Sequence, residues 1–129
     1  MKIKTIIIIV LAIILISFSI WEQIFIEKSL TKISSLATQI DNELTENKEI
    51  NDDILQKVEK LSAEWEKTEY TFCYILNHSD LTEVGDAICY ALTYIKQNNI
   101  DALQEKINVV KYYARSYLKL YSFDIKNIV

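Results

Sequence analysis

The sequence contains no proline and only one glycine, Gly85, in 129 residues. Tight β-hairpins depend on glycine and on proline-containing turns, so the chain has almost no material for a sheet built from hairpins. It also lacks any charged residue between Thr5 and Trp21, where isoleucine dominates. These absences favour an all-α chain with one apolar segment near its start.

Histidine and cysteine are equally scarce. His78 is the only histidine, and Cys73 and Cys89 are the only cysteines. A zinc site needs three or four convergent ligands, and a nucleophile needs a base beside it. The sequence therefore predicts no cofactor, no metal and no catalytic residue, and we expect a protein that is not an enzyme.

Charge is distributed unevenly along the chain. Two of the 14 basic residues, Lys2 and Lys4, precede the apolar segment, and all 18 acidic residues follow it, which leaves a net charge of −6 on the later part. Such a surface should repel nucleic acid and anionic lipid headgroups, so no nucleic-acid partner is predicted. Residues 41–69 are rich in acids and residues 96–126 in bases. Two helices with complementary faces or a partner-binding patch would explain this asymmetry.

Residues 5–21 have the length and composition of a membrane anchor. As a helix, these 17 residues span about 25 Å, slightly less than the ~30 Å hydrocarbon core of a bilayer. The lysines before the segment can reach the headgroups, and Trp21 suits the opposite interface. Because positive charge favours the cytoplasmic side, residues 1–4 are predicted to be cytoplasmic and residues 22–129 to form an extracytoplasmic bundle. The predicted location is the cell membrane, with a single span.

The same segment also has features of a cleaved signal peptide. A basic start, an apolar stretch and the small residues Ser17 and Ser19 match its three parts, and cleavage after Ser19 would release a secreted helical protein. No proline or glycine loosens the chain after Ser19, however. The helical phase instead continues into a seam with steps of four and three residues, formed by Ile26, Leu30, Ile33, Ala37, Ile40 and Leu44. An uncleaved anchor that continues as the first bundle helix is the favoured interpretation.

Polar stretches separate three further helices. The first helix should end near residues 45–47, and Asn51 or Asp52 can cap a second that ends near residues 77–78. Asp80 and Glu83 have the spacing of a capping box, so a third helix is predicted from Asp80. The stretch KQNNID marks the turn before a fourth helix, and the closing SFDIKNIV is predicted to be a short tail that docks back through Ile125, Ile128 and Val129.

Each of these helices carries an apolar seam. An antiparallel bundle of three or four helices would bury all the seams together. Gly85 falls on the inward side of the third helix, where it predicts a close approach of two helices. The expected core positions are Ile54, Val58, Leu61, Trp65, Thr68, Phe72 and Ile75; then Val84, Ile88, Leu92 and Ile95; then Leu103, Ile107, Val110, Ala114, Tyr117 and Tyr121.

The candidate interaction residues are aromatic or lie at a turn. All eight tyrosines follow residue 69 and recur at spacings of four, as in Tyr113, Tyr117 and Tyr121. Such stripes serve a binding face or the boundary of a core equally well. Trp65 is either a core anchor or a contact residue. His78 could be a pH-sensitive group, one ligand of a weak metal site or a residue that contacts a helix end.

Cys73 and Cys89 lie at similar distances from a turn predicted near Leu81. They could therefore face each other across an antiparallel helical hairpin and form a disulfide in an oxidising compartment. The alternative is that both are small buried residues.

Four stretches, FSIWEQIFIEKS, AEWEKTEYTF, LNHSDLTEV and the closing KNIV, resemble the domain-of-unknown-function family 4363. This family comprises small single-span membrane proteins of clostridia-like, spore-forming Firmicutes. The resemblance implies a membrane-anchored helical module with no assigned activity, cofactor or catalytic residue. Trp21, Glu22, Gln23, Trp65 and His78 match the pattern of the family.

These observations lead to two hypotheses of different classes. The first is a non-enzymatic, membrane-anchored bundle that acts as an accessory or scaffold in an extracytoplasmic complex, with another membrane protein or a second copy as its partner. The second is a ligand- or stress-sensing ectodomain in which tyrosines line a binding pocket.

Overall fold

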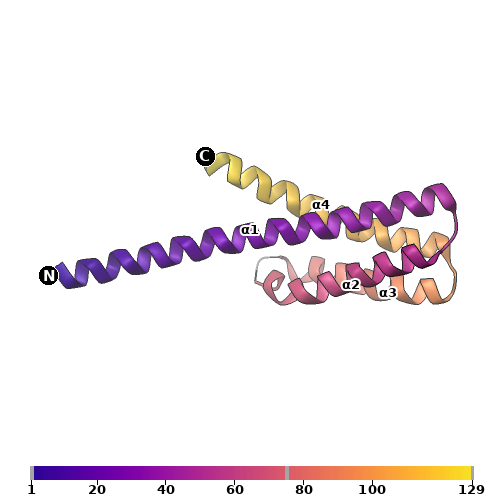
Figure 1. Cartoon of the computed structure of the whole chain (residues 1–129), viewed down its shortest axis with the longest axis horizontal. Coiled ribbons are helices and arrows are strands. Elements are labelled where there is room, and N and C mark those ends of the chain that lie inside the picture. The colour runs from indigo at the N-terminus through magenta and orange to yellow at the C-terminus, as the bar shows by residue number, and fades with distance from the viewer. Residues whose placement is uncertain (1, 75, 129) are drawn as a thin grey trace.

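The computed structural model describes residues 2–74 and 76–128, with side chains up to Leu120. The described residues form the helices α1 (Lys2–Asn47), α2 (Asp52–Phe72), α3 (His78–Lys96) and α4 (Ile100–Ile128). Each helix packs against the next along the chain, and α4 returns to pack against α1 (Figure 1). This arrangement is an up-and-down four-helix bundle. The predicted all-α bundle with a long apolar first helix is therefore confirmed.

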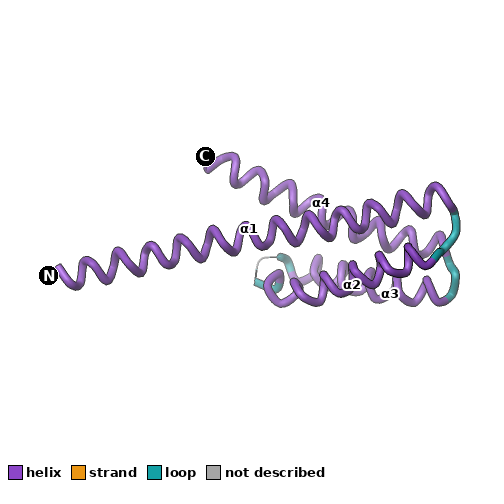
Figure 2. The backbone as a smooth tube through the Cα atoms, viewed as in Figure 1, coloured by secondary structure: helices purple, strands orange, loops and turns teal. Residues whose placement is uncertain are grey.

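Helix α1 is unbroken for 46 residues and has two different halves. None of residues 2–25 is buried, whereas the whole predicted seam from Ile26 to Leu44 is. Figure 2 shows the first half extending beyond the bundle as a single helix. The helix continues through the possible cleavage position at Ser19, whose hydroxyl donates a hydrogen bond to the Leu15 carbonyl at 3.0 Å. Bundle packing begins at Ile26, a few residues after the predicted boundary at Glu22.

The start of α2 follows the capping signal in the sequence. The side-chain oxygen of Asn51 accepts a hydrogen bond from the backbone N–H of Ile54 at 2.9 Å. Asp52 and Asp53 then occupy the first turn, where negative charge is favourable. Lys57 pairs with Glu43 of α1 and, at 3.0 Å, with Asp53 of its own helix. The predicted cap and both neighbouring helix ends are confirmed here.

The connection between α2 and α3 differs from the prediction. Helix α2 ends at Phe72, and α3 begins at His78 with Asn77 as its cap. The Asn77 side-chain oxygen accepts a hydrogen bond from the Ser79 backbone N–H at 2.8 Å. Asn is as good a cap as Asp and comes three residues earlier, so Asp80 lies inside the first turn of α3. The predicted start at Asp80 and the predicted end of α2 near residues 77–78 are both wrong.

Helix α4 also continues further than predicted. The backbone of SFDIKNIV is helical as far as Ile128, because the stretch contains no proline or glycine to end the helix. Figure 1 shows this end of α4 diverging from α1. The prediction of a separate tail is wrong for the backbone. The side chains of Ile125 and Ile128, and Val129 as a whole, lie outside the described residues.

The four seams meet in one continuous core. The predicted positions on α2 that the structure describes are all buried, and so are Leu103, Ile107, Val110 and Ala114 of α4. Leu92 and Ile95 are only half-buried, because α3 turns a slightly different face inward. Its buried residues are Leu81, Val84, Ala87, Ile88 and Ala91.

Gly85 does not mark a tight contact between helices. A Cβ atom at this position would lie 3.4 Å from Nε1 of Trp65, which is an ordinary van der Waals distance. Gly85 therefore lies on the inward side of α3, as predicted, and faces Trp65 of α2, but a close approach of the two backbones is not the reason for a glycine here.

Candidate functional site

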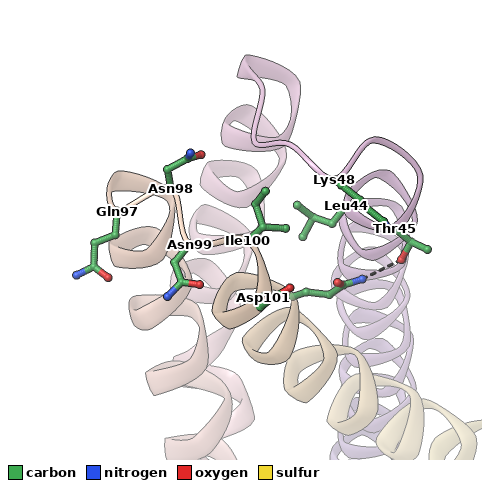
Figure 3. Close-up of a pocket in the computed structure, with 9 residues that line it drawn as sticks. Leu44, Thr45, Lys48, Gln97, Asn98, Asn99, Ile100 and Asp101 are labelled. Atoms are coloured by element: carbon green, nitrogen blue, oxygen red, sulfur yellow. Dashed lines mark hydrogen bonds between the residues drawn. The ribbon is translucent and has the colours of Figure 1, made fainter.

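A cavity of about 760 Å³ opens at the end of the bundle furthest from the apolar half of α1 (Figure 3). We call it the distal cavity. It lies where the connection between α1 and α2 meets the connection between α3 and α4. Its lining residues are Leu44, Thr45, Lys48, Gln97, Asn98, Asn99, Ile100, Asp101 and Gln104.

Two residues in the left-handed backbone conformation shape the rim of the distal cavity. Lys48 has φ 50° and Asn98 has φ 52°. Each follows a helix end: the Lys48 N–H donates to the Leu44 carbonyl at 3.0 Å, and the Asn98 N–H to the Ile95 carbonyl at 3.1 Å. Asparagine tolerates this conformation better than lysine does. Both turns are consequently short and bring their polar side chains to one end of the bundle.

A polar network joins α4 to α1 beside the distal cavity. Gln104 Nε2 donates hydrogen bonds to Asp41 Oδ1 at 2.9 Å and to Thr45 Oγ1 at 2.8 Å. Lys111 Nζ lies 2.6 Å from the other carboxylate oxygen of Asp41. Burial alone raises the pKa of Asp41, but the hydrogen bonds from Lys111 and Gln104 outweigh it and lower the pKa below its ordinary value. The acidic and basic stretches of the sequence meet at this ion pair.

The distal cavity has one basic and one acidic lining residue, Lys48 and Asp101, and its other polar lining side chains are neutral. Its mouth carries the exposed amide side chains of Gln97, Asn98 and Asn99. Asn99 also caps α4, since its side-chain oxygen accepts a hydrogen bond from the Ala102 N–H at 3.2 Å. Amides both donate and accept, which suits an uncharged polar ligand better than an ion. The sequence signal for this cavity is the run QNN, which by itself predicts only a turn.

Two of the candidate tyrosines connect α4 to α3. The hydroxyl of Tyr113 donates to Glu83 Oε2 at 2.7 Å, and that of Tyr117 donates to Asp80 Oδ2 at 2.5 Å. Both rings are half-buried, which places them at the boundary of the core. The hydrogen bond to Glu83 raises the pKa of Tyr113 to about 12. The side chain of Tyr121 lies outside the described residues.

Trp65 and His78 have different environments. Trp65 is only 5% exposed, and its ring centroid lies 5.9 Å from that of Phe72, so it is a core residue rather than a surface contact. His78 is exposed at the first position of α3. Within the part of the chain that the structure describes, no group of three or more possible metal ligands gathers around His78 or elsewhere.

Cys73 and Cys89 are both free and exposed, so neither the predicted disulfide nor the predicted buried pair is found. The reason is the position of the turn. Because α3 starts at His78, Cys73 lies at the turn, while Cys89 lies eleven residues along α3. That separation is about 16 Å along the helix axis, well beyond the reach of a disulfide.

The tyrosines that the structure shows as exposed do not include Tyr113 or Tyr117. Tyr70 and Tyr74 form an edge-to-face pair with ring centroids 5.7 Å apart. Tyr90 lies under the ammonium group of Lys106, which is 5.3 Å from its ring centroid. Tyr112 is exposed as well. A spacing of four residues could not tell these tyrosines from those at the core boundary.

Over residues 2–74 and 76–128 the geometry is that of an all-α bundle, in which one helix, α1, is long and apolar enough to be a membrane span or a signal sequence. The chain belongs to the family described as domain of unknown function (DUF4363), which matches residues 20–128. This confirms the family resemblance. The match begins at Ile20, so it covers the bundle and leaves out most of the apolar segment. No curated protein and no solved structure matches the chain.

Proposed function

We propose that this protein is a non-enzymatic, membrane-anchored helical module that serves as an accessory or scaffold in an extracytoplasmic membrane complex. The observation that carries the proposal is the construction of α1. Every side chain from Thr5 to Trp21 is exposed and none is charged, while the second half of α1 supplies one of the four helices of the bundle. An apolar helix of this length finds its favourable surroundings in lipid, and the bundle is then held at the surface of the membrane.

The anchor fixes where the bundle can act. Lys2 and Lys4 before the span favour a cytoplasmic N-terminus, with the bundle on the other side of the membrane. From Trp21 to the end of α1 at Asn47, the helix rises about 39 Å. The distal cavity therefore stands about that far from the bilayer, within reach of another membrane protein or of a second copy. The acidic bundle does not suit nucleic acid.

Membrane fractionation combined with intact mass tests the anchor. We expect the native protein to sediment with membranes, to resist extraction by high salt and alkali, and to have the mass of the uncleaved chain. A protein that begins at Ile20 and remains in the supernatant would contradict the proposal and support the secreted alternative. In favour of an uncleaved chain, α1 is one continuous helix from Lys2 to Asn47 and passes through Ser19 without a break.

Site-specific photocrosslinking in intact cells tests the scaffold role. A photoreactive residue at Asn98, on the rim of the distal cavity, should give a discrete crosslinked band with a membrane protein or with a second copy. The same residue at Glu59, which is exposed in the middle of α2, serves as the matched control. Absence of any band at Asn98, or equal labelling at both positions, would contradict a specific partner at this end.

The distal cavity favours a second candidate function, that of a ligand-sensing ectodomain. Its amide-lined mouth can bind an uncharged polar molecule, and no tyrosine is among its lining residues. This alternative therefore differs from the tyrosine-lined pocket expected from the sequence. A thermal-shift screen of neutral sugars and amides should raise Tm for the native protein and not for Asn99→Ala. No shift with any such compound would argue against sensing.

A further inference from the structure

The contact between α1 and α2 fixes how close the bundle comes to the apolar half of α1. Lys32 Nζ lies 3.6 Å from Glu64 Oε2, which places these two residues at the same level. The helices run in opposite directions (Figure 1). Tyr70 follows Glu64 by six residues, so it lies about 9 Å nearer to the apolar half and level with Ile26. Tyr74 follows in the turn after α2, near the level of Glu22.

Aromatic side chains from both helices gather at this level. On α1, Trp21 stacks on Phe25 with ring centroids 5.7 Å apart. On α2, the Tyr74 hydroxyl donates a hydrogen bond to the Tyr70 hydroxyl at 3.2 Å, and both tyrosines are 74% exposed. We call these four residues the proximal belt. Aromatic rings with a polar edge are enriched where hydrocarbon gives way to lipid headgroups.

The distance between the span and the core leaves no room for a flexible spacer. Ile26, the first buried residue of α1, comes only five residues after Trp21. Those five residues rise about 7.5 Å. Because α1 is continuous through this region, the near end of the bundle must stay at that height.

From this geometry we infer that the end of the bundle carrying Tyr70, Cys73 and Tyr74 is immersed in the headgroup layer of the bilayer. This inference rests on the membrane anchor of the proposed function. The occupant of this surface is the lipid headgroup region that surrounds residues 5–21. The contact is made by uncharged aromatic groups, and the exposed charges beside them have both signs, as in Glu69 and Lys67, so zwitterionic phosphatidylcholine is the matching surface.

The two native cysteines provide a matched pair of depth reporters. Both are exposed, and Cys89 lies about 16 Å further from the turn than Cys73 along α3. Cys89→Ser leaves only Cys73 for labelling with an environment-sensitive fluorophore, and Cys73→Ser leaves only Cys89. Each full-length protein is placed in phosphatidylcholine vesicles that contain lipid with a nitroxide on its headgroup. We expect a severalfold larger loss of fluorescence for the label on Cys73.

A second comparison tests the tyrosines themselves. In the Cys89→Ser protein, replacement of Tyr70 and Tyr74 by serine should lower the quenching at Cys73. Tyr90→Ser, which removes an exposed tyrosine from another part of the surface, should leave the quenching unchanged. If Tyr90→Ser changes the quenching at Cys73 as much as the replacement of Tyr70 and Tyr74 does, the contact of these two tyrosines with the headgroup layer is wrong.

Vesicle flotation separates the possible failures. If the protein floats with the vesicles but both labels are quenched equally, the headgroup contact is wrong and the anchor remains. If the protein does not float, the anchor and the headgroup contact are both wrong.

Discussion

The hydroxyl of Tyr113 lies 2.7 Å from Oε2 of Glu83, and this hydrogen bond ties α4 to α3. One helical turn further along α4, Tyr117 makes the equivalent contact with Asp80 at 2.5 Å. Each pair places a neutral donor against a carboxylate at the edge of the core. The face between α3 and α4 is therefore closed by polar contacts that depend on the ionisation of both partners.

The contact with Glu83 makes an alkaline titration informative. Since the pKa of Tyr113 is raised from 10.0 to about 12, the stability that this contact contributes is complete below pH 10. It is lost as the pH rises towards 12. Glu83→Gln should bring the ionisation of Tyr113 back towards the ordinary value for tyrosine. Absorbance of tyrosinate measured against pH checks this, with Asp86→Asn as a control on the same helix. An unchanged titration in Glu83→Gln would contradict the assignment.

The ion pair between Asp41 and Lys111 predicts sensitivity to acid. The pKa of Asp41 is lowered in the folded protein, so its contribution is present above the ordinary carboxyl pKa and is lost as the pH falls through the lower folded value. Asp41→Asn should cost about 1–3 kcal/mol of unfolding free energy at pH 7, because Lys111 loses its partner. This loss of unfolding free energy should be smaller at acidic pH. Urea denaturation at pH 7 and in acid measures the free energy of unfolding. The substitution Glu59→Gln, at an exposed position, should change this free energy little under either condition.

Replacement of Lys48 by glycine should increase the stability of the folded protein. Its φ of 50° is unfavourable for a side chain with a Cβ atom. Glycine adopts it freely, so Lys48→Gly should raise the free energy of unfolding by up to about 1 kcal/mol. Glu49→Gly is the control, because the backbone of Glu49 does not have a positive φ. Equal or lower stability of Lys48→Gly in thermal unfolding would show that the lysine side chain makes a compensating contact.

Gly85 offers a second gain in stability. An added Cβ would meet Nε1 of Trp65 at 3.4 Å, an ordinary contact. Gly85→Ala should therefore raise helix stability by about 1 kcal/mol, the difference in helix propensity between the two residues. Gly85→Ile should destabilise the protein, because its branches would extend into the indole. A loss of stability in Gly85→Ala would mean that the two helices pack more tightly than this geometry shows.

The cysteines can be tested without any substitution. Because both thiols are exposed and unpaired, a thiol-specific reagent should modify both in the native protein without prior reduction. Intact mass spectrometry counts the added groups. A protein that takes up none until it is reduced would contradict the separation of Cys73 from Cys89 and restore the disulfide.

Local patterns were sufficient to predict much of the fold. The seam from Ile26 to Leu44 and the cap at Asn51 were predicted because both depend on residues within a few positions of each other. The boundary between α2 and α3 was missed because Asn77 and Asp80 are competing caps three residues apart, and their relative strength depends on the surrounding packing. The predicted disulfide was wrong for the same reason, because it assumed a turn near Leu81.

The candidate site was harder to predict than the fold. The distal cavity forms where the turns that carry Lys48 and Asn98 meet. These residues are fifty positions apart, so no periodic pattern in the sequence predicts that they line one cavity. Likewise, the spacing of Tyr113 and Tyr117 matches that of Tyr70 and Tyr74. Only the orientation of each helix shows that the first pair bonds to α3, while the second pair is exposed and forms its hydrogen bond within the pair.

The continuity of α1 couples the angular setting of the apolar half to that of the bundle. No hinge separates Trp21 from Ile26, so any tilt or spin of the first segment is transmitted to all four helices at once. A single residue inserted between these two positions would turn the bundle by about 100° relative to the apolar half of α1. The direction in which the distal cavity faces, measured around the axis of the apolar half of α1, is thus set by the number of residues in that short stretch.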